Sequence, residues 1–196
     1  MLGILGCSLW MLFTPAPVEH PMLDVRPVEK WADSNGRKLN PLQQGKHKAT
    51  VLLFIMTDCP IANSYAPEIN RITAKYGPKD VAFYLVYVDP GADAAAVRKH
   101  MHDYGYHCKA LLDPHHSLAR LAGADVTPEA VVLGANREIV YRGRIDDRVI
   151  DFGQIRHRPN RQDLRLTLDA LLRGDAVPVA RTPCIGCFIS PESKEP

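Results

Sequence analysis

Cys59 is the residue of this chain whose sequence context most clearly favours chemistry. It follows an apolar run at 48–56 and is followed at once by Pro60, which suits a first helical turn because no backbone N–H is needed there. A thiol at the start of a helix faces unpaired backbone N–H groups and the positive end of the helix dipole, which favour the thiolate. We predict that Cys59 is a reactive nucleophile; the alternative is a buried, inert cysteine.

The other cysteines are Cys7, Cys108, Cys184 and Cys187. An odd number at wide spacing does not fit a small domain held by disulfides. Cys184 and Cys187 form Cys-x-x-Cys near the C-terminus, the spacing of a redox pair or of half a metal site. An oxidised Cys59 is recycled only by a second thiol, so a tail cysteine is the candidate resolving residue, unless the two pair with each other. Cys108 is expected to be a small core residue.

Two adjacent histidines, His115 and His116, support a second hypothesis. Soft thiolates combined with imidazole suit Cu(I). A copper site would use Cys59, Cys184 and Cys187 with one of these histidines. The main interpretation requires no cofactor.

The segments around these residues alternate between strand and helix patterns. Strands are predicted at 48–56, 81–88, 109–113, 130–133 and 138–144, and helices at about 61–76, 92–104, 117–123 and 161–174. Asn160 is a candidate cap for the last helix, and Asn35-Gly36 predicts a hairpin before the first buried strand. This order indicates an α/β fold.

Pro128 stands at the start of a predicted strand, where proline cannot complete the hydrogen-bond ladder. A cis bond between Thr127 and Pro128 would explain this position, and a trans proline on the first strand residue is the alternative. Farther on, Asp146, Asp147 and Arg148 are expected to form a salt-bridged loop.

The stretch DCPIANSYAP, which contains Cys59, resembles the active-site segment of the thioredoxin superfamily. In that superfamily a helix proline stands eight residues after the first cysteine, as Pro67 does here. Thr127-Pro128 matches the superfamily's cis-proline loop, which faces the active-site thiol. The resemblance implies a thioredoxin-like α/β fold: a central mixed β-sheet flanked by helices, with an N-terminal β-hairpin and a cysteine-bearing C-terminal tail.

Within that superfamily the chain is similar to exported bacterial redoxins of the thiol-specific-antioxidant and TlpA type. The shared features are the hairpin at 35–37, the DCPIANSYAPE stretch, residues 141–148 and the Gly-Cys-x-Ile ending at 186–189. The resemblance covers about residues 22 to 190. Because the ending centres on Gly186-Cys187, it favours Cys187 over Cys184 as the resolving thiol.

The chain departs from its relatives in two places. Ala62 occupies the position of the second active-site cysteine, so a dithiol cycle cannot run within this bend. Met56 and Leu52 stand where peroxiredoxins have their threonine and proline, and the hydroxyls of Thr57 and Ser64 are candidate substitutes. Copper chaperones of the Sco type share the fold but need two cysteines at the helix start, where this chain has one.

The sequence therefore predicts a thiol-dependent oxidoreductase. Cys59 attacks a disulfide or a peroxide, Cys187 or Cys184 resolves the product, and Thr127-Pro128 shapes the substrate groove. The expected partners are a protein thiol or disulfide, or a peroxide, and an external thiol reductant. A net charge of +2, from 24 basic and 22 acidic residues, gives no field that recruits nucleic acid.

The 196 residues are enough for one domain with additional segments at its ends. We expect an apolar export or anchor segment with a linker at 1–21, a thioredoxin-like domain at 22–180 and the tail at 181–196. The opening MLGILGCSLWMLF lacks Lys and Arg and is short for a bilayer span, but it resembles the hydrophobic region of a signal peptide. The expected location is the periplasm, with the protein free or anchored in the membrane.

Overall fold

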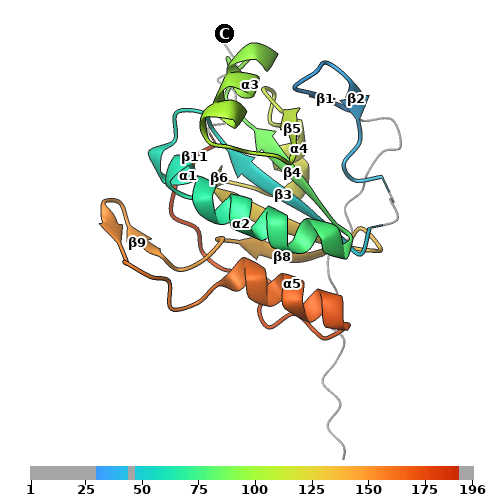
Figure 1. Cartoon of the computed structure of the whole chain (residues 1–196), viewed down its shortest axis with the longest axis vertical. Helices are drawn as coiled ribbons and strands as arrows, with labels where there is room; N and C mark the ends of the chain where they lie inside the picture. Colours follow the sequence, from blue (N-terminus) through green and yellow to red (C-terminus); the bar gives the residue numbers. More distant parts are fainter. Residues whose placement is uncertain (1–29, 44–46, 190–196) are drawn as a thin grey trace, which may run out of the picture.

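A central seven-stranded sheet organises the computed structural model, which describes residues 30–43 and 47–189 (Figure 1). The strand order is β2-β1-β5-β4-β3-β7-β8. The strands are β1 Trp31–Asp33, β2 Lys38–Leu39, β3 Ala49–Ile55, β4 Val81–Tyr87, β5 Lys109–Leu112, β7 Glu129–Gly134 and β8 Ile139–Gly143. The β3–β4 and β4–β5 pairs are parallel and the others antiparallel, so the sheet is mixed, as predicted.

Helices cover both faces of the sheet, which is why its central strands are apolar throughout. They are α1 Pro60–Ser64, α2 Ala66–Tyr76, α3 Ala94–Asp103, α4 Ser117–Ala122 and α5 Asp163–Arg173, with a 3₁₀ turn at Gly77–Lys79. α2 and α5 lie on one face of the sheet (Figure 1). They contribute Ile69, Ile72, Leu164 and Leu168 to the core there. α4 and Trp31 pack on the other face.

The helix predicted at about 61–76 is interrupted in the structure. α1 ends at Ser64, and α2 begins at Ala66 after the junction residue Tyr65. Pro67 explains the break, because it has no N–H to donate to the carbonyl of Asn63 and its ring crowds that carbonyl. The predicted hairpin at Asn35-Gly36 is confirmed as the β1–β2 pair.

The predicted start of the last helix was wrong. α5 begins at Asp163, its N-cap residue is Gln162 and no side chain caps it. The backbone N–H groups of Asn160 and Arg161 instead point to the carboxylate of Asp147, with Arg161 N 2.9 Å from Oδ1. This contact holds the preceding loop outside the helix.

Two small sheets had no counterpart in the sequence interpretation. β9 Val149–Asp151 and β10 Gln154–Ile155 form an arm that projects from the body (Figure 1). β11 Cys187–Phe188 pairs antiparallel with β6 Val126–Thr127, so the described part of the tail, residues 181–189, lies on the domain.

No helix in the described ranges is long and apolar enough to cross a membrane. The expected export or anchor segment at 1–21 lies outside the described residues.

Candidate redox site

Cys59 sits between the end of β3 and the start of α1. It is the N-cap residue of α1, and the backbone N–H of Ala62 donates to its Sγ at 3.4 Å. The Cys59 thiol donates to the carbonyl oxygen of Thr127 at 3.2 Å. The Thr127–Pro128 peptide bond is cis, which explains the strand-initial position of Pro128 and rules out the alternative of a trans proline. Cys59 is only 1% exposed, so access to its sulfur is controlled by what lies over it.

The tail brings a second thiol to Cys59. Cys187 lies opposite Thr127 in the β11–β6 pair, which places its thiol close to that of Cys59. The Ile189 N–H donates to the Asp125 carbonyl at 2.9 Å, which extends the pairing. Gly186 permits this approach, because a Cβ there would lie 2.0 Å from the Thr127 oxygen.

The two tail cysteines have different surroundings. Burial, followed by the hydrogen bond and charge interaction with Cys59, raises the pKa of Cys187 from 9.0 to about 12. Burial also raises the pKa of Cys184, whose charged neighbours include Glu129, Arg144 and Arg142. Cys59, Cys184 and Cys187 are all free thiols in this structure. Cys187 therefore contacts Cys59, whereas Cys184 lies in a separate polar environment.

The raised pKa of Cys187 predicts that alkaline solution loosens the tail. The thiol ionises more easily when the tail is released, so its contribution to pairing is complete below about pH 9 and declines as pH rises toward 12. NMR measurement of the Cys187 Cβ and Ile189 amide shifts should show parallel transitions above about pH 9. The Cys187→Ser variant should lack the transition; a transition of equal size in that variant would assign it to another group.

A polar cluster joins α1 to the loop after β8. The Tyr65 hydroxyl donates to Asp146 Oδ1 at 2.7 Å, and the Arg148 N–H donates to the same oxygen at 2.9 Å. The Arg148 guanidinium lies 4.5 Å from the centre of the Tyr65 ring and donates to the Ser64 carbonyl. Burial and the Asp146 hydrogen bond raise the pKa of Tyr65, which keeps this hydroxyl a donor. The cluster fixes the end of the helix that Cys59 begins.

A second network lies under the loop before Cys59. Asp89 Oδ1 accepts from both the N–H of Thr57 at 2.7 Å and its hydroxyl at 2.5 Å. Asn63 donates to the Thr57 carbonyl at 2.9 Å, and its side-chain oxygen lies 2.9 Å from His100 Nε2. The Ser64 hydroxyl donates to the Ile61 carbonyl. The Thr57 and Ser64 hydroxyls are thus bound elsewhere, and the structure does not support their substitution for the peroxiredoxin threonine.

The copper hypothesis is not supported by the geometry. Within residues 30–43 and 47–189, no group of three or more His, Cys, Asp or Glu residues is placed to hold a metal ion. His116 is buried and donates through Nε2 to the Val88 carbonyl at 2.8 Å, and His115 is exposed. The structure therefore does not bring either histidine and the three cysteines together as ligands.

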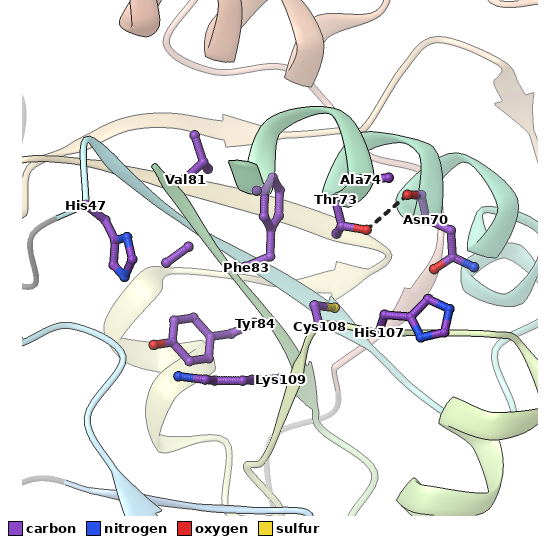
Figure 2. Close-up of a pocket in the computed structure, with 12 residues that line it drawn as sticks. His47, Asn70, Thr73, Ala74, Val81, Phe83, Tyr84, His107, Cys108 and Lys109 are labelled. Atoms are coloured by element: carbon purple, nitrogen blue, oxygen red, sulfur yellow. Dashed lines mark hydrogen bonds between the residues drawn. The ribbon is translucent and has the colours of Figure 1, made fainter. Parts of the chain in front are cut away.

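A cavity of about 370 Å³ lies beside α2, β4 and β5, with Cys108 in its wall (Figure 2). Phe83, Tyr84 and Lys109 also line it, and Cys59 does not. Burial raises the pKa of Cys108 to about 12, so its thiol stays protonated near neutral pH. Cys108 also packs against the main core, in agreement with the expected structural role.

The family model described as Redoxin matches residues 19–155, more than half of the chain. The chain belongs to the Redoxin family. This result agrees with the thioredoxin-like fold, the cis proline and the position of Cys59 before the first helix. No curated protein is significantly similar to this redoxin.

Solved structures share the architecture. An uncharacterized conserved protein from Geobacillus kaustophilus has 26% identity and a TM-score of 0.74, with 91% of this chain and 96% of that chain covered. A hypothetical protein from Sinorhizobium meliloti has 25% identity and a TM-score of 0.70, covering 82% and 89%. A structure from Chlorobium tepidum that carries the name thiol:disulfide interchange protein DsbE has 18% identity and a TM-score of 0.58, covering 79% and 99%.

The sequence interpretation missed the supporting residues of the site. Tyr65 and Asn63 lie in the quoted DCPIANSYAP segment, but only the structure shows that they reach Asp146 and His100. Asp89 is the second residue after β4 in the parallel β3–β4 pair, where side chains gather at the strand ends. This position after a parallel strand was the one feature of the sequence that indicated that Asp89 could support the loop before Cys59.

Proposed function

We propose that this redoxin is a two-cysteine oxidoreductase in which Cys59 is the nucleophile and Cys187 the resolving thiol. The observation that carries the proposal is the closeness of the two thiols: Cys187 pairs with Thr127, whose carbonyl accepts the hydrogen bond of Cys59. A resolving thiol must reach the oxidised sulfur, and here it is already beside it. Cys184 has no such contact with Cys59.

The cycle begins when Cys59 reacts with an oxidant. A hydroperoxide transfers an oxygen: the S–O bond forms, the O–O bond breaks, and water or an alcohol leaves, giving a sulfenic acid on Cys59. A disulfide substrate instead gives a mixed disulfide and releases one thiol. In either case Cys187 then attacks the Cys59 sulfur, forming the Cys59–Cys187 disulfide and releasing water or the second thiol.

The raised pKa of Cys187 fits the order of these steps. While Cys59 is reduced, burial and the Cys59 contact keep Cys187 as a thiol, so it does not compete for the oxidant. An external thiol reductant must finally restore both cysteines. We further propose that this occurs outside the cytoplasm, on the basis of the apolar opening of the chain and the DsbE name carried by the Chlorobium tepidum neighbour.

Mass mapping of disulfides tests the cysteine assignment. The reduced protein is treated with stoichiometric hydrogen peroxide, alkylated, digested without reductant and compared with an untreated sample. We expect a peptide linking Cys59 to Cys187 that appears only after peroxide. A Cys184–Cys187 link with Cys59 still alkylated would refute the resolving role.

A further inference from the structure

The strand edge nearest Cys59 is already occupied. β6 is two residues long, and β11 pairs with it through Cys187 opposite Thr127 and Phe188 opposite Val126. An extended peptide binds such an edge by adding a strand to it. With the tail in this register, no second peptide can pair with the backbone of β6 from that side.

The tail is attached on both sides of the segment 183–186. Before it, the Thr182 N–H donates to the Arg142 carbonyl at 3.1 Å, and the Thr182 and Tyr141 hydroxyls lie 2.7 Å apart. After it, the Ile189 N–H donates to the Asp125 carbonyl. Between these attachments, Gly186 lies directly on Thr127. Cys59 is consequently covered by an anchored segment, which accounts for its 1% exposure.

A small cavity remains between the tail and the body. It has a volume of about 210 Å³, and its wall includes Tyr65, Pro128 and Ile185. Cys59 itself does not line this cavity. The cavity wall comes near it at Pro128, which adjoins Thr127, the residue whose carbonyl accepts the Cys59 hydrogen bond, and Ile185 of the tail forms another part of the wall. The volume is below the roughly 300–1,000 Å³ of sites that hold drug-sized ligands, so the cavity suits a smaller molecule.

The lining of this cavity is apolar apart from Arg144, Arg156 and the Asp146 carboxylate, which accepts hydrogen bonds from the Tyr65 hydroxyl and the Arg148 backbone N–H. Val149, Ile150 and Pro183 contribute apolar surface. The two cations in the wall have partners: Arg144 pairs with Asp163 at 2.7 Å and Arg156 with Asp147 at 3.7 Å. A small neutral molecule fits this environment better than a charged peptide does.

We propose that the tail makes Cys59 selective for small neutral hydroperoxides and excludes protein disulfides. This inference rests on the proposed function and specifies its oxidant. The hydroperoxide enters through the cavity beside Pro128, and its oxygen is transferred to the Cys59 sulfur as the O–O bond breaks. The alcohol leaves with the proton, and Cys187 resolves the sulfenic acid with release of water while the backbone pairing persists.

Single-turnover oxidation of the full chain tests the selectivity. The oxidants are tert-butyl hydroperoxide and a peptide whose cysteine carries a thionitrobenzoate group, and Cys59 oxidation is read by alkylation and mass spectrometry. Two separate variants are used to release the tail. Gly186→Ala places a Cβ against the Thr127 carbonyl. Ile189→Pro removes the backbone N–H that donates to the Asp125 carbonyl. Gly91→Ala is the matched control, because a Cβ there meets nothing within 4 Å.

We expect the peptide disulfide to oxidise the wild type and Gly91→Ala at least about tenfold more slowly than either tail variant, because access requires local opening. The hydroperoxide should react with all four proteins within about threefold of one another. Equal peptide rates in wild type and both tail variants would overturn the selectivity while leaving the two-cysteine cycle intact. A hydroperoxide that reacts only after tail release would overturn the assigned substrate class. A Cys59 inert to both oxidants in every variant would refute the proposed function itself.

Discussion

Cys187→Ser should retain the first oxidation of Cys59 and lose the second. The backbone pairing of β11 with β6 does not need the Cys187 sulfur, so the serine variant keeps the covered site. Without a thiol beside Cys59, the sulfenic acid or mixed disulfide has no internal partner and accumulates. Turnover with an external thiol reductant should fall by at least about 100-fold, since an intramolecular thiol acts at high effective concentration.

Trapping with dimedone and mass spectrometry detects the accumulated sulfenic acid in this experiment. Cys59→Ser should consume no peroxide at this site. Cys184→Ser is the matched control: it changes the other cysteine of the same tail, which is not paired opposite Thr127, and should retain turnover. Loss of turnover in Cys184→Ser with full activity in Cys187→Ser would reverse the assignment.

Gly143→Ala should destabilise the protein through the attachment of the tail. Gly143 has a φ of +156°, and a Cβ there would lie 2.1 Å from Thr182 Oγ1, 2.7 Å from its carbonyl oxygen and 2.9 Å from its nitrogen. Relief requires displacement of backbone and not only of a flexible side chain. We expect the free energy of unfolding to fall by about 2–4 kcal/mol.

Urea denaturation followed by circular dichroism measures this loss. Gly91→Ala should stay within about 0.5 kcal/mol of the wild type, because its added methyl group meets open space. An unchanged urea midpoint in Gly143→Ala would show that Thr182 does not pack against β8 in solution as the structure describes.

The central sheet was predictable because its strands carry unambiguous patterns. The apolar run at 48–56 has no polar face, so it had to lie between two helix layers, where β3 is found. Pro128 was also informative. Proline has no backbone N–H to donate to the hydrogen-bond ladder of a sheet, so its place at the start of a strand indicated a cis peptide bond. The end of the last helix at Gly174 was also correct, and Gly174 adopts a left-handed conformation there.

The elements that were missed are specified by distant contacts. β11 is two residues long, and nothing in Cys187-Phe188 indicates that it pairs with Val126-Thr127, some sixty residues earlier. The start of α5 depends on Asp147 binding the preceding backbone, which outweighs the local capping preference of Asn160. The position of Cys59 between a buried strand and a helix was therefore predictable, while its supporting residues required the fold.

The outer edges of the central sheet are protected in different ways. β2, at one edge, has only two residues and offers little backbone to another chain. β8, at the other, is five residues long, and the segment before the cysteines covers it: the Arg142 N–H donates to the Ala180 carbonyl, and its carbonyl accepts from Thr182. The tail that carries the proposed resolving thiol thus also covers the strand most able to pair with a second molecule, which protects that sheet edge against edge-to-edge association.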